Sequence, residues 1–515
     1  MTHPAAPQQS STRTAIAPDR LSRLALLAIV VWLLLQGTLR ILTASSLGLD
    51  EAQLMVTAQS LEWGYGPQPP LYSWLQYGVF ALLGPSIPSL VYTKEAMLAG
   101  TFVLFFLASR LVLGEERRAV VATLLLFTIP QIVWESQRAL SHSVLALLLA
   151  AAALYLVVRI LRYARPADYI LLGVAIGLGL LSKYNFAIFA IALVGAAMLS
   201  ERDRPRILSG WFALSLLIAA LITAPHFYWG LTHLDLMLAS SGKFAIEANM
   251  PFFDRVALPV LGAGSSIASF SAITALIVVV AAFAPPRRTS PAPGGAMWRE
   301  GSVFIVRLLL VTVAVVIATP LLSGATVVMD RWLMPVLFFL PLPLLIVCSR
   351  WLDEGRLRLL AVLATVSAVV CSAGLTAAAL LPDLVGRGLR GTEPYAAFAE
   401  SIRRDVADPA YILADTTSIS GNLKLAFPRA TVVDSAGAMP TDTGRGVQAA
   451  IVAWPGGDDM PADLQSRVAS VCTASLPGDA THLRAAYEHS QTLFLEMSYL
   501  IVSDCRTPEA LPGGS

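Results

Sequence analysis

The chain has 515 residues, of which 56% are hydrophobic and only 14% are charged. Soluble domains carry about a quarter of charged residues, so a mean hydropathy of +0.68 indicates that most of this chain lies in a lipid bilayer. The formal net charge of +2 does not indicate a nucleic-acid-binding protein, because the basic residues are scattered over many loops and form no patch.

The N-terminal residues 1–20 are polar, and we expect them to be disordered on the cytoplasmic side of the membrane. The first apolar run starts at Leu24 and continues to Leu42 without a small-residue cleavage site. This pattern is typical of an uncleaved signal anchor rather than of a cleaved signal peptide.

About eleven apolar runs occur along the chain, each near the length that a helix needs to cross the hydrocarbon core. They lie at 22–43, 90–113, 119–134, 142–161, 168–182, 185–200, 207–229, 257–283, 303–323, 331–348 and 359–381. The stretch 69–84 predicts one or two further helices at the membrane interface. The sequence therefore predicts a polytopic α-helical membrane protein with about 11–13 helices.

Basic residues occupy alternate loops, as the positive-inside rule requires of a multi-pass protein. With a cytoplasmic N-terminus, the inner loops hold Arg110, Arg117, Arg118, Arg159, Arg162, Arg165, Arg202, Arg204, Arg206, Arg287, Arg288, Arg299, Arg350, Arg356 and Arg358. The outer loops carry few basic residues. An odd number of spans then places everything after about residue 382 on the extracytoplasmic face.

Residues 391–506 differ in character from the apolar runs and predict a small extracytoplasmic α/β domain. Its expected strands are short β-branched runs at Ala410–Ala414, Thr431–Val433, Ala449–Ala453 and Leu500–Val502. Cys472 and Cys505 would lie in an oxidising compartment, where a disulfide between them and two unpaired cysteines are equally consistent with the sequence. The sequence contains no metal-type Cys-x-x-Cys spacing.

The first outer loop carries two adjacent acids, Asp50 and Glu51, directly after a predicted span. An acid at this depth is costly unless it is solvated or paired, which makes both carboxylates candidate catalytic groups. The alternative is that they cap a helix or lie in a solvated loop. The segment that follows favours a sugar site, because its prolines rigidify an extended turn and its aromatic rings offer stacking faces, although the aromatic belt of a membrane protein explains some of these rings. These residues are Trp63, Tyr65, Pro67, Pro69, Pro70, Tyr72 and Trp74.

Other outer segments hold further candidates. His142 in the second outer loop can exchange a proton near neutral pH, and Glu135 could reach the same site, but His142 could equally cap the next span. Lys183, which ends a glycine-rich span, and Arg331, at the start of a late span, could bind a phosphate. Snorkelling and interface anchoring are the plain alternatives for these two cations. The loop 230–254 is long enough to predict a mobile cover over the site.

The order of these motifs resembles a known family. Asp50-Glu51 precedes Gln68-Pro69-Pro70-Leu71-Tyr72, which is followed by Trp74-Leu75. This arrangement is similar to the first periplasmic loop of bacterial GT-C glycosyltransferases, in particular the dolichyl-phosphate-mannose protein mannosyltransferase-like group that includes the lipid A aminoarabinose transferase. The resemblance covers about residues 20–350 and is strongest in residues 48–75.

The resemblance implies a GT-C fold, with residues 21–385 as the transmembrane catalytic module, in the inner membrane of a bacterium. It implies a polyprenyl-phosphate-linked sugar as donor, transfer on the extracytoplasmic side, and Asp50 as the catalytic base. The donor phosphate would be bound by Lys183, Arg138, Arg331 and Gln68, and the substrate would be lined by Tyr65, Tyr72 and Tyr184.

This sequence departs from the family pattern at two places. Many relatives carry an acid near the position of Ser141 and His142, so His142 is expected to take over that catalytic role. Relatives usually carry Lys where Gln68 stands, so one phosphate-binding charge is missing there. Gln68 can still donate a hydrogen bond.

The predicted function is an inverting transfer of a sugar to a cell-envelope glycolipid, polysaccharide or protein. A phosphate-cradling Gly-x-x-x-x-Gly-Lys loop is absent from the sequence, which fits a lipid-linked donor. Asp50 and Glu51 could hold a divalent cation, although the sequence shows no full set of ligands for one. The alternative function is a flippase or transporter of lipid-linked sugars, for which charges are expected within the spans. Lys94 and Glu95 are the main charges of that kind, and we expect them to pair or to face the first-loop site.

Overall fold

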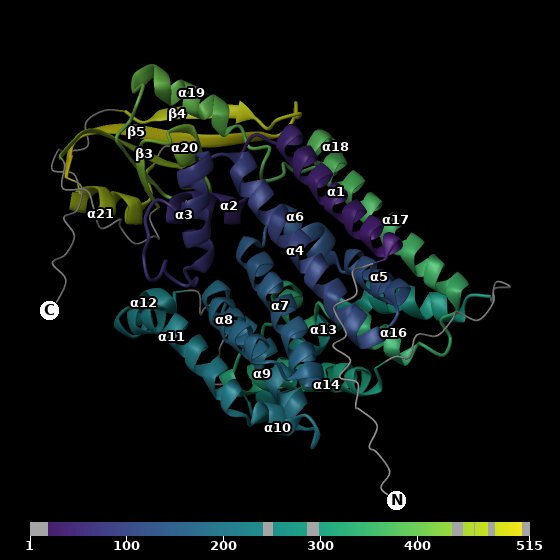
Figure 1. Ribbon diagram of the computed structural model, residues 1–515. Helices are drawn as coiled ribbons and strands as arrows, with labels where there is room; N and C mark the ends of the chain where they lie inside the picture. Colours follow the sequence, from purple (N-terminus) through teal and green to yellow (C-terminus); the bar gives the residue numbers. More distant parts are fainter. Residues whose placement is uncertain are drawn as a thin grey trace, which may run out of the picture.

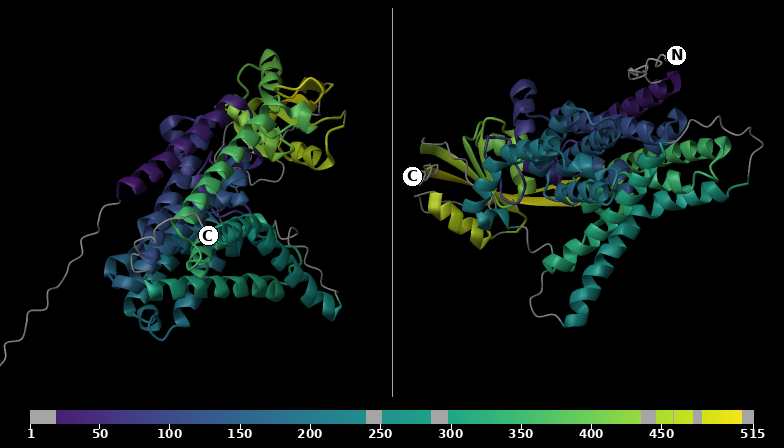
Figure 2. Two further views of the ribbon diagram at one scale, coloured as in Figure 1. Left: turned by 90° about the vertical axis from the view of Figure 1, so that its right-hand side faces the viewer. Right: turned by 60° about the horizontal axis from the view of Figure 1, so that its bottom comes forward.

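The computed structural model describes residues 19–239, 251–285, 298–434, 446–457, 459–471 and 479–506. In this part of the chain, a helical membrane unit carries a small sheet domain at one end (Figure 1). Figure 2 shows the sheet domain at the same end of the helical unit in two further views. The predicted disorder of the first residues, the Cys472–Cys505 disulfide and the centre of the predicted cover loop lie outside the described residues.

Seven described helices are long and apolar enough to cross a membrane. They are α1 (Arg20–Thr43), α4 (Ile87–Leu113), α7 (Ser141–Tyr163), α11 (Gly210–Thr232), α13 (Phe252–Phe283), α14 (Arg299–Ser323) and α17 (Glu354–Leu380). The helix α1 begins within the segment predicted to be disordered, because the Asp19 side chain caps it by accepting a hydrogen bond from the Ser22 N–H at 2.7 Å.

Two further spans are bent pairs of helices. The first consists of α5 (Glu116–Leu124) and η1 (Leu125–Thr128) followed by η2 (Gln131–Glu135) and α6 (Ser136–Arg138), with a bend of 70°. The second consists of η4 (Asp330–Leu333) and α15 (Met334–Leu337) followed by α16 (Pro341–Val347), with a bend of 66°. Pro130 and Pro341 lie at the two breaks, where a proline removes a backbone donor and kinks a helix.

Length and apolar composition therefore identify seven of the eleven predicted runs as full spans among the described residues, or nine with the bent pairs, which fits the predicted polytopic helical class. The two remaining runs form α8 (Pro166–Ser182) and α9 (Phe186–Met198), which are helical but have only 17 and 13 residues. Composition does not reveal this difference, because a short buried helix and a full span are equally apolar.

The centre of the bundle is formed by α7 and α4. In their most apolar windows, 72% of α7 and 56% of α4 are buried, against 22% of α1 and 17% of α17. The helices α1 and α17 lie side by side at one flank (Figure 1). Their outward faces are therefore the surfaces that meet lipid.

The first outer loop folds into α2 (Leu49–Thr57) and α3 (Leu71–Leu83), so the predicted interfacial stretch is a single helix. Three short helices, α10 (Arg204–Ile207), α12 (Leu234–Met237) and α18 (Pro382–Val385), complete the described connections of the helical unit. Of these elements, α2 lies between the membrane helices and the sheet domain (Figure 1).

The tail forms an α/β domain, as predicted. Its elements are α19 (Tyr395–Asp405), β1 (Tyr411–Ala414), α20 (Thr417–Ala426), β2 (Thr431–Asp434), β3 (Gly446–Pro455), α21 (Ala462–Val471), β4 (Thr481–Ala486) and β5 (Phe494–Arg506). The strand order is β2-β1-β3-β5-β4, parallel for the first three and antiparallel for the rest. The predicted strand runs are confirmed, whereas β4 was missed because it is a largely exposed edge strand without an apolar run.

The tail domain is docked on α2 through close backbone contacts. Asn422 Oδ1 accepts a hydrogen bond from the Leu47 N–H at 2.8 Å. Gln59 pairs with the backbone of Val432 in the edge strand β2, donating at 2.7 Å and accepting at 3.0 Å. Gly421 packs so closely that a Cβ there would lie 2.3 Å from the Cα of Ala52. The position of α2 therefore depends on both units of the protein.

We predict that Gly421→Ala loosens this contact. The new methyl group would overlap the α2 backbone, and overpacking of this kind costs about 1–3 kcal/mol. Thermal unfolding of the full-length protein in detergent should show a lower Tm than that of the wild type. Gly78→Ala is the control, because a Cβ at Gly78 meets nothing within 4 Å. Equal unfolding temperatures for the two variants would contradict the prediction.

Candidate active site

The carboxylate of Asp50 is held at the N-terminus of the central helix α7. Its Oδ2 accepts hydrogen bonds from the backbone N–H groups of Leu140 at 2.7 Å and Ser141 at 3.1 Å. Leu140 has a left-handed backbone with φ of 68° as the residue that precedes α7. The positive end of the helix dipole favours an anion at this place. Asp50 is partly exposed, and both of these hydrogen bonds go to Oδ2 rather than to Oδ1.

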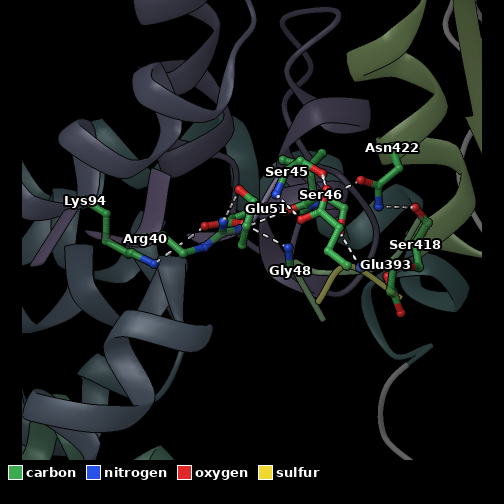
Figure 3. A network of polar contacts seen from close by, with 12 residues as sticks. Arg40, Ser45, Ser46, Gly48, Glu51, Lys94, Glu393, Ser418 and Asn422 are labelled. Atoms are coloured by element: carbon green, nitrogen blue, oxygen red, sulfur yellow. Dashed lines mark hydrogen bonds and ion pairs between the residues drawn. The ribbon is translucent and has the colours of Figure 1, made fainter. Parts of the chain in front are cut away.

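Glu51 has a different environment, although it is the next residue in the chain (Figure 3). Its carboxylate accepts hydrogen bonds from Arg40 at 2.9 Å and from the Gly48 N–H at 2.8 Å, and Lys94 Nζ lies 3.8 Å away. The side chain is buried. Burial raises the pKa of Glu51, but Arg40, Lys94 and the Gly48 N–H together hold it below its usual value. Lys94 thus faces the first loop, as expected.

The catalytic role predicted for Glu51 stays a prediction, but the surroundings of this side chain are those of a structural group. A buried carboxylate that already binds two cations and a backbone donor is a structural group, because its oxygens are engaged by the protein. The same geometry separates it from Asp50, whose partners lie on α7. Neighbours in a helix point in directions about 100° apart, so adjacent acids do not share one site.

His142 and Tyr72 lie near Asp50, and Lys183 lies near His142. The imidazole of His142 is buried, lies near both Asp50 and Lys183, and has its ring centre 5.4 Å from that of Tyr72. Its Nδ1 has no hydrogen-bond partner among the described residues. Lys183, at the end of α8, donates a hydrogen bond to the hydroxyl of Ser143. The structure thus brings together candidates from three separate outer segments.

The two other predicted tyrosines, Tyr184 and Tyr65, form hydrogen bonds in neighbouring outer segments. Tyr184 shares a 2.9 Å hydrogen bond with His226 Nε2, and His226 Nδ1 lies 2.7 Å from the carbonyl oxygen of Trp63. This chain of contacts joins α8, α11 and the first outer loop. Tyr65 uses its hydroxyl within its own loop, donating to the Ser60 carbonyl and accepting from the Glu62 N–H at 2.9 Å. Tyr65 therefore holds the loop in shape.

The predicted phosphate ligands do not all converge. Arg331 is exposed at the start of η4, and its neighbour Trp332 accepts a 2.6 Å hydrogen bond from Asn185, which places this segment beside the Lys183 turn. Arg138 instead forms an ion pair of 3.6 Å with Glu135 and lines a cavity with Arg40. Arg138 therefore belongs to a different group from Lys183.

Gln68 lies in the turn before α3, where its backbone forms an isolated bridge with Tyr65, and its side chain is partly exposed. Sequence reasoning missed the backbone donors of Leu140 and Ser141, together with Ser143 and Asn185. Backbone groups carry no sequence signal, and serine and asparagine at helix ends are too common to single out.

The described residues contain no group of three or more His, Cys, Asp or Glu side chains that could hold a metal ion. Asp50 and Glu51 point to different protein partners. They do not offer the paired oxygen ligands that a divalent cation would need.

Comparison with known proteins places these features in context. A family model described as dolichyl-phosphate-mannose-protein mannosyltransferase matches residues 67–229. The lipopolysaccharide core galacturonosyltransferase RgtB of Rhizobium johnstonii is 34% identical over 446 residues, which cover 85% of this chain and 88% of RgtB. The corresponding enzyme RgtA of the same organism is 34% identical over 418 residues, covering 79% of this chain and 81% of RgtA.

A solved structure shares the fold. The crystal structure of ArnT from Cupriavidus metallidurans bound to undecaprenyl phosphate aligns with a TM-score of 0.55 at 15% sequence identity. The alignment covers 92% of this chain and 97% of ArnT. The expected GT-C fold, with a small α/β domain after the membrane helices, is thereby confirmed.

We predict that Glu51→Gln destabilises the protein far more than Asp50→Asn. Loss of the buried carboxylate leaves Arg40 and Lys94 without their partner, and breaking a buried ion pair in this way costs about 3–5 kcal/mol. Asparagine at position 50 can still accept the hydrogen bonds of Leu140 and Ser141. Thermal unfolding of the two isosteric variants in detergent provides the measurement.

The pH dependence of stability provides the control for this prediction. The native pKa of Glu51 lies below its unfolded value of about 4.3. Its stabilisation is therefore complete above that pH and is lost as the pH falls through the native pKa. The wild type and Glu51→Gln should become more alike in stability below about pH 4. A gap that stayed constant down to pH 3 would contradict the assignment.

Proposed function

The chain belongs to the family of membrane glycosyltransferases that includes the lipopolysaccharide core galacturonosyltransferases, and we propose that it transfers galacturonic acid from a polyprenyl-phosphate donor to a lipopolysaccharide core. The observation that carries this proposal is the partly exposed carboxylate of Asp50 at the N-terminus of α7, with Lys183 and His142 beside it. The relatives support the sugar and the acceptor, because they match this chain over most of its length.

Asp50 acts as the general base in this mechanism. Its free oxygen accepts the proton of an acceptor hydroxyl while that hydroxyl oxygen attacks the anomeric carbon of the donor sugar. A new glycosidic bond forms on one face as the bond to the phosphate oxygen breaks on the other, which inverts the configuration. The polyprenyl phosphate leaves with the electron pair of the broken bond.

Two cations stabilise the negative charges of the donor. Lys183 lies near the imidazole that neighbours Asp50, and we assign it to the leaving phosphate, where charge develops as the bond breaks. Arg331 is exposed beside the same turn and suits the carboxylate of a uronic acid, since a guanidinium binds carboxylates in bidentate fashion.

The buried His142 and Tyr72 are assigned to the sugar itself. His142 Nδ1 has no hydrogen-bond partner in the described part of the protein and can bind a sugar hydroxyl. Tyr72 packs against its ring and fixes its orientation. Asp50 and Glu51 have different protein partners and do not form a shared pair of ligands, so we propose a reaction that needs no divalent cation.

The distribution of basic residues over the loops indicates the orientation of the protein in the membrane. We propose the bacterial inner membrane, with the N-terminus in the cytoplasm and the tail domain in the periplasm, because the basic loops alternate in this sense. The transporter alternative is disfavoured. Lys94 and Glu95, the charges within α4, contact Glu51 and Gln137 and are held by the protein instead of lining a transport path.

Asp50→Asn is expected to lower transfer by about 10²–10⁴-fold, because an amide cannot accept the acceptor proton. The assay uses proteoliposomes with labelled polyprenyl-phosphate galacturonic acid and lipopolysaccharide, followed by mass spectrometry of the glycolipid products. Asp235→Asn, an exposed acid on α12, should retain wild-type transfer. Near-normal turnover of Asp50→Asn would exclude Asp50 as the base.

Lys183→Gln is expected to lower kcat/KM for the donor by about 10-fold or more, since a charge-assisted hydrogen bond contributes about 1.5–3 kcal/mol. Lys183→Arg keeps the positive charge and should recover part of the loss. Initial rates over a range of donor concentrations measure both effects. If Lys183→Gln and the wild type had the same kcat/KM, the donor phosphate would have to be bound elsewhere.

A further inference from the structure

A cavity of about 60 Å³ lies on the lipid-facing flank of the protein, where the outer ends of α1 and α17 meet the linker to the tail domain. This volume holds several water molecules, and therefore also a group the size of a phosphate. The lining includes Arg40, Arg138 and Arg390, which come from α1, α6 and the linker. The mechanism proposed above uses none of these arginines.

These three arginines lie at the outer ends of the helices, whereas most basic residues of the chain lie in the inner loops. Basic residues of a multi-pass protein collect in its inner loops, as they do here. Guanidinium groups gathered at the opposite end must be compensated by acids or by a ligand, because charge at the membrane boundary is costly when unpaired.

The acids of the protein compensate these arginines only in part. Arg40 is partly buried, with a side chain that is 16% exposed, and it donates hydrogen bonds to Glu51 and to the carbonyl oxygens of Ala44 at 3.1 Å and Ser46 at 2.8 Å (Figure 3). Arg138 has a loose pair of 3.6 Å with Glu135, and both side chains are 36% exposed, so this pair contributes little. Arg390 forms no ion pair within the described part of the chain.

A buried amide adds a second, independent sign of a ligand. Gln36 on α1 lines the same cavity and is only 4% exposed. Its Oε1 has no hydrogen-bond partner among the described residues. A buried polar atom without a partner is costly and rare in a folded protein. Thr43 and Thr376 add hydroxyl groups to the lining, so the cavity offers hydrogen-bonding groups as well as positive charge.

The surroundings of the cavity are those of a lipid site. Outward-facing side chains on both helices are strongly exposed, with Leu35 and Leu42 on α1 at 55% and 74% and Val370 on α17 at 62%. An acyl chain can lie along this apolar flank while its headgroup reaches the arginines. A soluble anion would gain nothing from the flank, which favours a lipid as the source of the phosphate.

We propose that this cavity binds the phosphate of an outer-leaflet lipid headgroup. Arg390 and Arg138 contact the phosphate oxygens, Arg40 supplies positive charge from below, and the Gln36 side chain bonds a headgroup hydroxyl. A lipid here would also steady the active site, since Arg138 is two residues from Leu140, whose N–H holds Asp50. This inference concerns binding alone and does not rest on the proposed sugar transfer.

The test measures lipid retention by native mass spectrometry of the full-length protein in detergent. Dioleoyl phosphatidic acid is the probe, and dioleoylglycerol has the same chains without phosphate. The wild type should retain phosphatidic acid at least 10-fold better than dioleoylglycerol. Arg390→Gln should lose this preference and Arg390→Lys should keep part of it. Arg387→Gln removes an exposed arginine of the same linker outside the cavity lining and should behave as the wild type does.

Each other outcome overturns the proposal. Equal retention of the two lipids by the wild type would exclude recognition of the phosphate. Equal losses in Arg390→Gln and Arg387→Gln would reduce the effect to general surface charge. Inorganic phosphate that displaces the lipid at low millimolar concentration would assign the cavity to a soluble anion. Arg138→Gln provides a second variant, expected to lose the preference with an unchanged Tm, because its pair with Glu135 is exposed.

Discussion

The buried carboxylate of Glu51 is the contact on which the arrangement of the outer face depends. It joins Arg40 of α1 and Lys94 of α4 to the beginning of α2. Arg40 and Lys94 lie near the ends of membrane helices and need an anionic partner, and the buried Glu51 carboxylate needs cationic partners. These ion pairs therefore fix α1, α4 and α2 relative to one another. The tail domain then closes over α2 through Asn422 and the close contact at Gly421.

The two adjacent acids have different partners in this arrangement. Glu51 is fixed inward by the ion pairs, and the turn of the helix aims Asp50 at the N-terminus of α7. The central position of α7 makes its first backbone N–H groups a rigid support for the carboxylate. The proposed base is therefore positioned by α7, which has the highest buried share of the seven candidate spans among the described residues, while Asp50 itself stays partly exposed. A glycosyltransferase needs both properties in its base.

The outer face carries two groups of cations with different surroundings. Lys183, Asp50 and Tyr72 gather around His142. Arg138 and Arg390 line a cavity with Arg40 at the ends of α1 and α17. The segment from Arg138 to His142, where the chain turns through the left-handed Leu140 into α7, connects the two groups. This segment is thus shared by the proposed sugar site and the proposed lipid-phosphate site.

The sequence by itself determined the membrane class and the α/β tail domain and indicated Asp50 as a candidate, because hydropathy, strand-forming runs and an acid beside a span are local properties. It could not separate full spans from the short helices α8 and α9, nor Asp50 from Glu51, nor Arg138 from Lys183. Those differences depend on which groups lie opposite one another: Glu51 faces Arg40 and Lys94, and Asp50 faces the N–H groups of Leu140 and Ser141. Such partners are determined by how helices distant in the sequence pack together. Neither a backbone N–H donor nor the burial of a side chain can be recognised from the residue types in the sequence.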